Sequence, residues 1–382
     1  MNHLKKMLFY GVLMVGFLNC HRTVPPKKNA SPIAVNQVKY AKNFKWYSFA
    51  DYDLIEVSAN GFSSGTHQRY LIVDRSKEIP ADVAYDVLIR PSLNSIIATS
   101  TPQVSVLERL GFIDALVGFP QPGWIASTDV QKRVKKGQIK DIGANNGLNI
   151  ESILSLQPDV FFGFEVDGNN PAYTRLQQLN IPIVMVHDWQ EKSPLGKAEW
   201  LLFFGVILGE KQNAIDQFQQ TKERYARLLN QIHRPNPSPN RVMAGAVYKD
   251  QWFAPGGGSF FAGFLSDCEV EYIFSSDSQT GSLALSIEKL LVEGQKADIW
   301  MTPGAFDTYK ALASEYPMIA SLPSFQNKRI FTYKKEWIDG EPKILYFQDA
   351  SFHPDRVVED LLQIFYPETF PSKSWHYFSP LK

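Results

Sequence analysis

The chain has 382 residues, and its 39 basic and 39 acidic side chains give a formal net charge of zero. With no excess of positive charge, the composition argues against a nucleic-acid-binding protein or a protein that binds a charged membrane surface. The length is typical of two domains, and an apolar content of 44% is enough to build two hydrophobic cores.

The N-terminus has the pattern of a secretory signal that ends in a cysteine. The apolar run from Met7 to Leu18 follows a short basic start and is too short for a transmembrane helix. The stretch resembles a bacterial lipobox, which implies cleavage before Cys20 and a lipid on this residue. Asn19 departs from the small residue usual there, so an ordinary signal peptide remains the alternative. We expect residues 1–20 to be the signal and residues 21–40, rich in Pro, Lys, Asn and Ser, to be a flexible tether.

Residues 41–209 are predicted to hold short strands and then a first α/β lobe. Between Phe44 and Val73, short apolar runs alternate with turn residues, which predicts antiparallel strands. From about Arg90 onward, buried-type strands and helices follow one another, and this alternation indicates parallel strands. Asn149 is predicted to cap one of these helices.

The stretch from Pro194 to Ile232 is predicted to organise the whole chain. Ala198–Leu208 is apolar almost all round and predicts a buried helix, which Gly209 ends. From Lys211 the apolar residues recur at helical spacing over about twenty residues, which corresponds to roughly 30 Å. We expect residues 210–233 to form a stiff connecting helix between two lobes.

Residues 239–382 are predicted to be a second lobe that repeats the first. Arg241–Tyr248 predicts a strand, and a loop with three glycines leads into a helix. Ile287-Glu288 opens a helix that matches the one opened by Ile150-Glu151, and Pro354–Phe365 predicts a final amphipathic helix. Cys268 is expected to be a buried apolar residue. The predicted fold is α/β, with two Rossmann-like lobes joined by one long helix and preceded by short antiparallel strands.

Loops after the strand ends of both lobes are predicted to face each other across a cleft, because open α/β sheets bind ligands beyond the carboxyl ends of their strands. Several of these loops carry aromatic residues, although burial in a core is an equal alternative for any single Trp. The glycines before the helix near Phe260 indicate either an anion contact through backbone N–H groups or a close-packed turn. The expected ligand-binding residues are Thr99, Ser100, Thr101, Pro102, Trp124, Asn145, Asn146, Phe164, Glu165 and Trp189 in the first lobe, and Trp252, Gly256, Gly257, Gly258, Ser259, Phe306 and Trp337 in the second.

Most of the chain after Arg90 resembles the periplasmic substrate-binding proteins of iron-siderophore and vitamin B12 ABC transporters. The resemblance implies a class III periplasmic binding protein with little hinge motion, a metal complex as ligand, and delivery to an inner-membrane permease. It also implies that Glu151 and Glu288 pair with permease arginines, the alternative being that they only stabilise their helix N-termini. The stretches that carry the resemblance are, in order, SIIATSTPQVSVLERLGFIDALVGF, DIGANNGLNIESILSLQPDVFFGF, KAEWLLFFGVILGEKQNAIDQF, PGGGSFFAGFLSDCEVEYIF and SIEKLLVEGQKADIW.

The cargo and the rival functions stay open at this point. The sequence does not separate a ferric siderophore from haem or cobalamin, and the lack of an obvious arginine clamp favours a neutral or mixed ligand. A bare metal ion would need several His and a carboxylate, for which His187-Asp188 is the one candidate. A secreted α/β hydrolase would need a nucleophile and a base, and no G-x-S-x-G elbow is present. A structural lipoprotein without a ligand is the third alternative, against which the aromatic residues in loops argue.

The resemblance leads to a set of general expectations. We expect a monomeric binding protein that is not an enzyme and needs no cofactor or resident metal. We expect it in the periplasm of a bacterial cell envelope, held at a membrane only by its lipid anchor.

Overall fold

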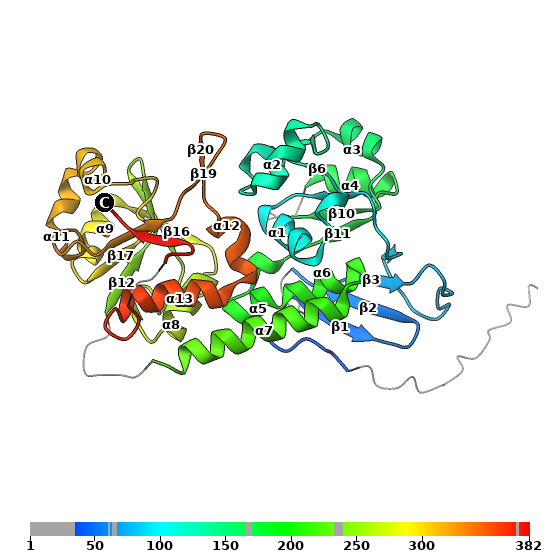
Figure 1. The fold of residues 1–382 in the computed structure, drawn as a ribbon, viewed down its shortest axis with the longest axis horizontal. Coiled ribbons are helices and arrows are strands. Elements are labelled where there is room, and N and C mark those ends of the chain that lie inside the picture. The colour runs from blue at the N-terminus through cyan, green and yellow to red at the C-terminus, as the bar shows by residue number, and fades with distance from the viewer. Residues whose placement is uncertain (1–34, 60–61, 63–66, 165–169, 233–239, 372–373) are drawn as a thin grey trace, which may run out of the picture. The chain divides into compact units, whose positions relative to one another are not determined.

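The computed structural model describes residues 35–59, 62, 67–164, 170–232, 240–371 and 374–382, and Val35–Lys382 form one compact unit (Figure 1). The predicted signal peptide and Cys20 therefore lie outside the described residues, as does Glu165. Within these ranges, no helix combines the length and the apolarity needed to cross a membrane.

The compact unit begins earlier than predicted, because buried carboxylates hold the residues expected at the end of the tether. The Glu199 carboxylate accepts hydrogen bonds from the backbone N–H groups of residues 39, 40 and 41 at 2.9, 2.6 and 2.8 Å. The Glu191 carboxylate does the same for residues 42 and 43 and also accepts from Trp200 Nε1. The packed chain thus includes residues 36–40, and the predicted boundary at residue 40 is wrong.

An N-terminal sheet follows this segment. The antiparallel strands β1 (Phe44–Ser48), β2 (Tyr52–Val57) and β3 (Gln68–Val73) confirm the prediction. A fourth strand, β4 (Val87–Ile89), pairs with β3 in parallel and was not predicted, because it is three residues long and lies in a polar stretch.

The first lobe is built on a sheet of five parallel strands in the order β11-β10-β5-β6-β7. Its apolar strands are buried, as expected for a sheet covered on both faces. The strands are β5 (Ile96–Ala98), β6 (Leu116–Phe119), β7 (Lys140–Asp141), β10 (Val160–Gly163) and β11 (Ile183–Met185). The helices are α1 (Thr101–Leu110), α2 (Thr128–Lys135), α3 (Ile150–Leu156) and α4 (Pro171–Gln178), and β8 (Gly143–Ala144) and β9 (Gly147–Leu148) form a small hairpin.

The second lobe has a matching sheet in the order β15-β12-β17-β18-β21, in which only β21 is antiparallel. A three-stranded sheet and a hairpin accompany it. The strands are β12 (Arg241–Ala244), β13 (Ala246–Tyr248), β14 (Gln251–Pro255), β15 (Glu271–Tyr272), β16 (Ser282–Ser286), β17 (Ile299–Met301), β18 (Ile330–Tyr333), β19 (Glu336–Ile338), β20 (Glu341–Lys343) and β21 (Phe378–Pro380). The helices are α8 (Phe260–Asp267), α9 (Ile287–Gly294), α10 (Tyr309–Glu315), α11 (Pro323–Gln326), α12 (Tyr346–Asp349) and α13 (Pro354–Phe365).

The single strand predicted at Arg241–Tyr248 is wrong, because Gly245 divides it between two sheets. Gly245 has a φ of +111°, which L side chains rarely adopt, and a Cβ there would lie 2.2 Å from the carbonyl oxygen of Phe253. Strand β12 therefore stays in the main sheet while β13 turns away to pair with β14.

The predicted connector is present as three helices, α5 (Pro194–Ala198), α6 (Trp200–Leu208) and α7 (Lys211–Leu229). Every residue of α6 is buried, and Gly209 ends it with a φ of +81°. Helix α7 has 19 residues and is therefore roughly 28 Å long. Its Phe218 packs in the core of the first lobe and its Tyr225 in that of the second, which confirms the predicted connecting helix (Figure 1).

A second connection between the lobes was not predicted. Helix α12 and the 3₁₀ turn after it, Ala350–Phe352, lie against α1 of the first lobe. Ser105 Oγ donates to Asp349 Oδ1 at 3.0 Å, and Thr101 Oγ1 donates to the carbonyl of Phe347 at 3.3 Å. The Phe352 ring is buried among first-lobe residues. The lobes are therefore held together at α7 and again at α12.

Candidate functional site

Two neighbouring cavities lie where the lobes meet. The inter-lobe cavity, of about 280 Å³, is lined by both lobes, and the first-lobe cavity, of about 370 Å³, is lined by the first lobe and α5. Pro102, Trp189 and Lys197 line both, so the two cavities share a wall. Together they reach the size range of small-molecule binding sites.

The first-lobe cavity lies beyond the carboxyl end of β5, as predicted. Gln103 Oε1 accepts from the backbone N–H groups of Thr99 and Ser100, and Asn145 Nδ2 donates to the carbonyl of Thr99 at 3.1 Å. These bonds fix the turn from β5 into α1. Eight predicted ligand-binding residues line this cavity, namely Thr99, Ser100, Thr101, Pro102, Trp124, Asn145, Phe164 and Trp189.

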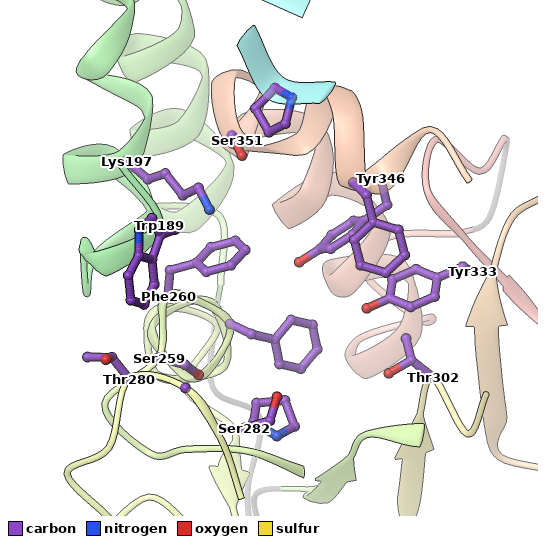
Figure 2. A pocket seen from close by; sticks show the side chains of 15 residues that line it. Trp189, Lys197, Ser259, Phe260, Thr280, Ser282, Thr302, Tyr333, Tyr346 and Ser351 are labelled. Atoms are coloured by element: carbon purple, nitrogen blue, oxygen red, sulfur yellow. The ribbon is translucent and has the colours of Figure 1, made fainter. Parts of the chain in front are cut away.

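The inter-lobe cavity has an aromatic wall that the sequence did not reveal. Tyr333 at the end of β18 and Tyr346 in α12 lie opposite Lys197 and Phe260, with their hydroxyl groups toward the cavity (Figure 2). Burial raises the pKa of Tyr333 to about 12, against the opposing effect of a hydrogen bond with Thr302, and burial raises the pKa of Tyr346 as well. Both phenols therefore stay protonated and remain able to donate a hydrogen bond.

Lys197 supplies the positive charge of the site. Its side chain is 8% exposed and reaches into the inter-lobe cavity from α5 (Figure 2). The ammonium nitrogen lies 4.1 Å from the centre of the Phe260 ring, within the range of a cation–π contact. Burial lowers the pKa of Lys197, and the charges of Asp188 and Glu191 oppose this effect.

The prediction that Trp252 faces the cleft is wrong. Its side chain is 0% exposed, packs in a core of the second lobe, and donates from Nε1 to the carbonyl of Ala244 at 3.1 Å. Trp252 lies in β14, where buried and less buried residues alternate, so its ring points to the covered face of the strand. Phe306 likewise packs edge to face on Tyr316.

The glycine loop before α8 is a packing turn. A Cβ at Gly257 would lie 2.1 Å from the carbonyl oxygen of Phe274, and Gly256 and Gly258 have equally close backbone neighbours. The loop is therefore pressed against residues 274–281, and Gly257 does not line the inter-lobe cavity. Ser259 does line it, and its Oγ caps α8 by accepting from the N–H of Ala262.

Two predicted tryptophans are exposed on opposite lobes. Trp124 is 72% exposed and lines the first-lobe cavity, whereas Trp337 is 70% exposed and lines neither cavity. Trp337 lies on the β19–β20 hairpin, whose turn residue Asp339 forms an ion pair of 2.5 Å with Lys135 of α2. The hairpin thus touches the opposite lobe. Asn146 is exposed and lines neither cavity.

The two candidate docking glutamates occupy matching places in the two lobes. Glu151 and Glu288 are exposed in the first turns of α3 and α9. The side chains of Asn149 and Ser286 cap these helices by accepting from the N–H groups three residues on. Both carboxylates are exposed, and that of Glu288 also takes part in its helix start, where a hydrogen bond from Ser286 and then one from its own backbone lower its pKa.

The structure offers no metal cluster among the residues that it describes, where no three His, Cys, Asp or Glu side chains come together. His187, the one candidate from the sequence, has a pKa that burial lowers to about 4. Cys268 is buried, as predicted. A resident metal ion therefore has no set of ligands in the described part of the chain.

Sequence reasoning missed Lys197, Tyr333, Tyr346 and Phe347. Lys197 had a weak signal, because it directly precedes Ala198–Leu208, the stretch predicted to be a buried helix. The other three flank the hairpin, and only its fold brings Tyr333 and Phe347 together, with ring centres 4.9 Å apart.

Comparisons with known proteins give a consistent picture. The family described as "Periplasmic binding protein" matches residues 96–337. An uncharacterized lipoprotein of Methanocaldococcus jannaschii is 22% identical over 362 residues, which are 89% of this chain and 84% of that protein. A second uncharacterized lipoprotein of this organism is 20% identical over 348 residues, covering 88% of this chain and 85% of its own length.

Solved structures share the fold at low sequence identity. A periplasmic heme binding protein from Pseudomonas aeruginosa matches with a TM-score of 0.58 and 17% identity, covering 76% of this chain and 98% of that one. A possible iron-binding protein from Staphylococcus epidermidis has a TM-score of 0.55 and 18% identity, covering 72% of this chain and 99% of that one. The periplasmic vitamin B12 binding protein BtuF of Vibrio cholerae has a TM-score of 0.50 and 18% identity, covering 73% of this chain and 99% of that one.

Proposed function

Because the chain belongs to the periplasmic binding protein family, as its match over residues 96–337 shows, we propose that it binds an iron complex between its lobes for an ABC importer. The complex is a ferric siderophore or a haem-type ligand, and cobalamin or another corrinoid is the alternative cargo. The protein hands the complex to a permease in the inner membrane.

The pair of adjoining cavities is the observation that carries this proposal. Trp189 and Pro102 belong to the wall common to both, while Phe260 and Tyr346 lie on opposite sides of the inter-lobe cavity. A bulky chelate with apolar faces needs such aromatic walls and a few polar groups that fix its orientation. Haem and vitamin B12, which are named for two proteins of the same fold, are ligands of this kind.

The site residues of the proposal follow from the two cavities. Trp252, Gly257 and Trp337 are not assigned to it, since none of them lines either cavity. We assign ligand contact to the predicted residues that do, which are Thr99, Ser100, Thr101, Pro102, Trp124, Asn145, Phe164, Trp189 and Ser259.

The proposal includes the place of the protein in the cell. A monomer anchored through a lipid on Cys20 at the periplasmic side of a membrane fits the signal pattern, and two relatives are called lipoproteins. Glu151 and Glu288 would then dock on the permease, one from each lobe.

Fluorescence titration of the full chain tests the cargo. We expect haemin, ferrioxamine B, ferric enterobactin or cyanocobalamin to quench the tryptophan emission saturably with a stoichiometry of one, because Trp124 and Trp189 line the cavities. Trp124→Phe should reduce the quenching amplitude, whereas the buried Trp300 should contribute little to the change. Binding of none of these complexes would overturn the proposal, and turnover of an ester substrate would favour the hydrolase instead.

A further inference from the structure

The ammonium group of Lys197 has no partner of opposite charge in contact with it. Among the residues that the structure describes, no ion pair or hydrogen bond involves Nζ, and its one described contact is with the Phe260 ring, whose centre lies 4.1 Å away. A buried lysine is costly unless it is paired, so its retention in a cavity wall needs an explanation.

The two acidic side chains whose charges act on Lys197 are Glu191 and Asp188, and both accept hydrogen bonds from backbone N–H groups. Glu191 accepts hydrogen bonds from the N–H groups of Lys42 and Asn43 and from Trp200 Nε1. Asp188 acts on Lys197 through its field but forms no ion pair with it among the described residues. The positive charge of Lys197 is therefore available to a bound molecule.

Trp189 in the same wall also has an unused donor, but this atom is covered rather than open to the cavity. Trp189 Nε1 is buried and has no hydrogen-bond partner in the described part of the structure. Lys197 and Trp189 lie on one side of the inter-lobe cavity, facing Tyr333 and Tyr346 (Figure 2). Ser351 adds a hydroxyl group near Lys197 (Figure 2), so this side of the cavity favours a ligand that brings acceptors to it.

The charged residues that line the two cavities determine which acceptor group the ligand brings and in which cavity it binds. Asp188 lines the first-lobe cavity and would repel an anion there, whereas no acidic residue lines the inter-lobe cavity in the described chain. Lys197 is also the one cationic residue described in that lining, and no arginine fork is present to hold a doubly charged phosphate. A single carboxylate on the side of Phe260 satisfies both conditions.

We propose that the Lys197 ammonium binds a carboxylate of the cargo in the inter-lobe cavity, so that the cargo is a carboxylate-bearing metal complex rather than a neutral one. This inference rests on the proposed function and restricts the cargo to metal complexes that carry a carboxylate. It replaces the neutral or mixed ligand that the sequence favoured, because no position for a cationic clamp could be recognised in the sequence.

Matched pairs of probes test the carboxylate directly. We would titrate the full chain with haemin and haemin dimethyl ester, with cyanocobalamin monocarboxylic acid and cyanocobalamin, and with succinylated and acetylated ferrioxamine B. Within each pair only the carboxylate changes. For the pair that fits, we expect the wild type to bind the acid about ten- to hundredfold more tightly, the usual effect of one charge-assisted hydrogen bond.

Variants at position 197 assign this preference to the lysine. Lys197→Met and Lys197→Gln should abolish the preference for the acid, and Lys197→Arg should retain most of it. Lys192→Met is the matched control, since Lys192 is exposed in the loop before α5 and lines neither cavity. The readout is a ratio of two affinities for one protein, so a general loss of packing does not imitate the result.

The outcomes separate this inference from the proposed function. Saturable binding of a probe with equal affinity for its acid and neutral forms would overturn the carboxylate site while leaving the binding function in place. An acid preference that survives in Lys197→Met would also overturn it. If no probe binds the wild type, the proposed function fails and the carboxylate site fails with it.

Discussion

Ser105 in α1 and Asp349 in α12 are joined by a hydrogen bond of 3.0 Å, although 244 residues separate them in the chain. Asp349 also accepts from Tyr377 at 2.7 Å and from Arg356 at 3.2 Å, and its side chain is largely buried. One carboxylate therefore ties the first lobe to two elements of the second.

Asp349→Ala should destabilise the protein by about 3 kcal/mol, because it leaves the hydroxyl of Tyr377 and the guanidinium of Arg356 without their partner. Ser105→Ala removes one neutral donor and should cost about 1 kcal/mol. Urea unfolding followed by circular dichroism measures both. Equal losses in the two variants would contradict the role of Asp349 as the shared partner.

Trp252→Ala should cost about 3–5 kcal/mol, because it empties a fully buried site in the second lobe. The matched change Trp337→Ala removes an indole that is 70% exposed and should stay within about 0.5 kcal/mol of the wild type. Urea midpoints of the two variants compare them directly. A Trp252→Ala protein with the stability of the wild type would restore the sequence-based view of Trp252 as a cleft residue.

Trp252 and Trp337 show that some features of the site could be predicted from the sequence and others could not. The loops at Thr99–Pro102 and Asn145, which were predicted to bind the ligand, line the first-lobe cavity, since strand-to-helix turns put them beyond the sheet. Trp252 was misplaced because a two-residue period in a short strand is hard to recognise next to a glycine loop. The glycines were ambiguous for a physical reason, because close packing against another backbone and binding of an anion both require a missing side chain.

The missed residues share another cause. Tyr333 and Phe347 come together only because the β19–β20 hairpin returns the chain to its starting point. The contact of α12 with α1 likewise depends on tertiary packing between segments far apart in sequence. Local patterns predicted the lobes and the connecting helix, whereas the wall between the lobes needed the fold.

Acid should weaken the fold partly through His187. Burial lowers its pKa from the ordinary 6.5 to about 4, so the unfolded chain binds a proton between these values that the folded protein does not. The contribution of His187 to the free energy of unfolding is complete above about pH 6.5 and falls as the pH drops toward 4. One pKa unit corresponds to about 1.4 kcal/mol, and because the ring is partly exposed we expect a loss of about 2 kcal/mol.

His187→Gln should make the fall in unfolding free energy between pH 7 and pH 4 shallower by this amount. Urea unfolding at a series of pH values for both proteins isolates the contribution of His187, since the other titrating groups are common to them. Parallel curves for the variant and the wild type would show that His187 does not contribute.

Joint replacement of Glu151→Ala and Glu288→Ala should slow uptake of the cargo several-fold and leave its affinity for the purified protein unchanged. Exposed carboxylates at matched places set the register and rate of docking more than its strength. The control is Glu223→Ala with Glu368→Ala, which removes two other exposed carboxylates. Uptake into vesicles that contain the permease and titration of the free protein measure the two quantities. A loss of cargo affinity in the docking variant would assign the two glutamates to the binding site instead.

The carboxylates of Glu191 and Glu199 would transmit a pulling force from the N-terminal segment to the rest of the folded unit. They grip residues 39–43 beside α5 and α6, where α6 belongs to the core of the first lobe and α5 lies against α8 of the second. Tension on the first described residues would load the pairing of Asn36 and Gln37 with β1 and would then pass through these carboxylates to the junction of the lobes.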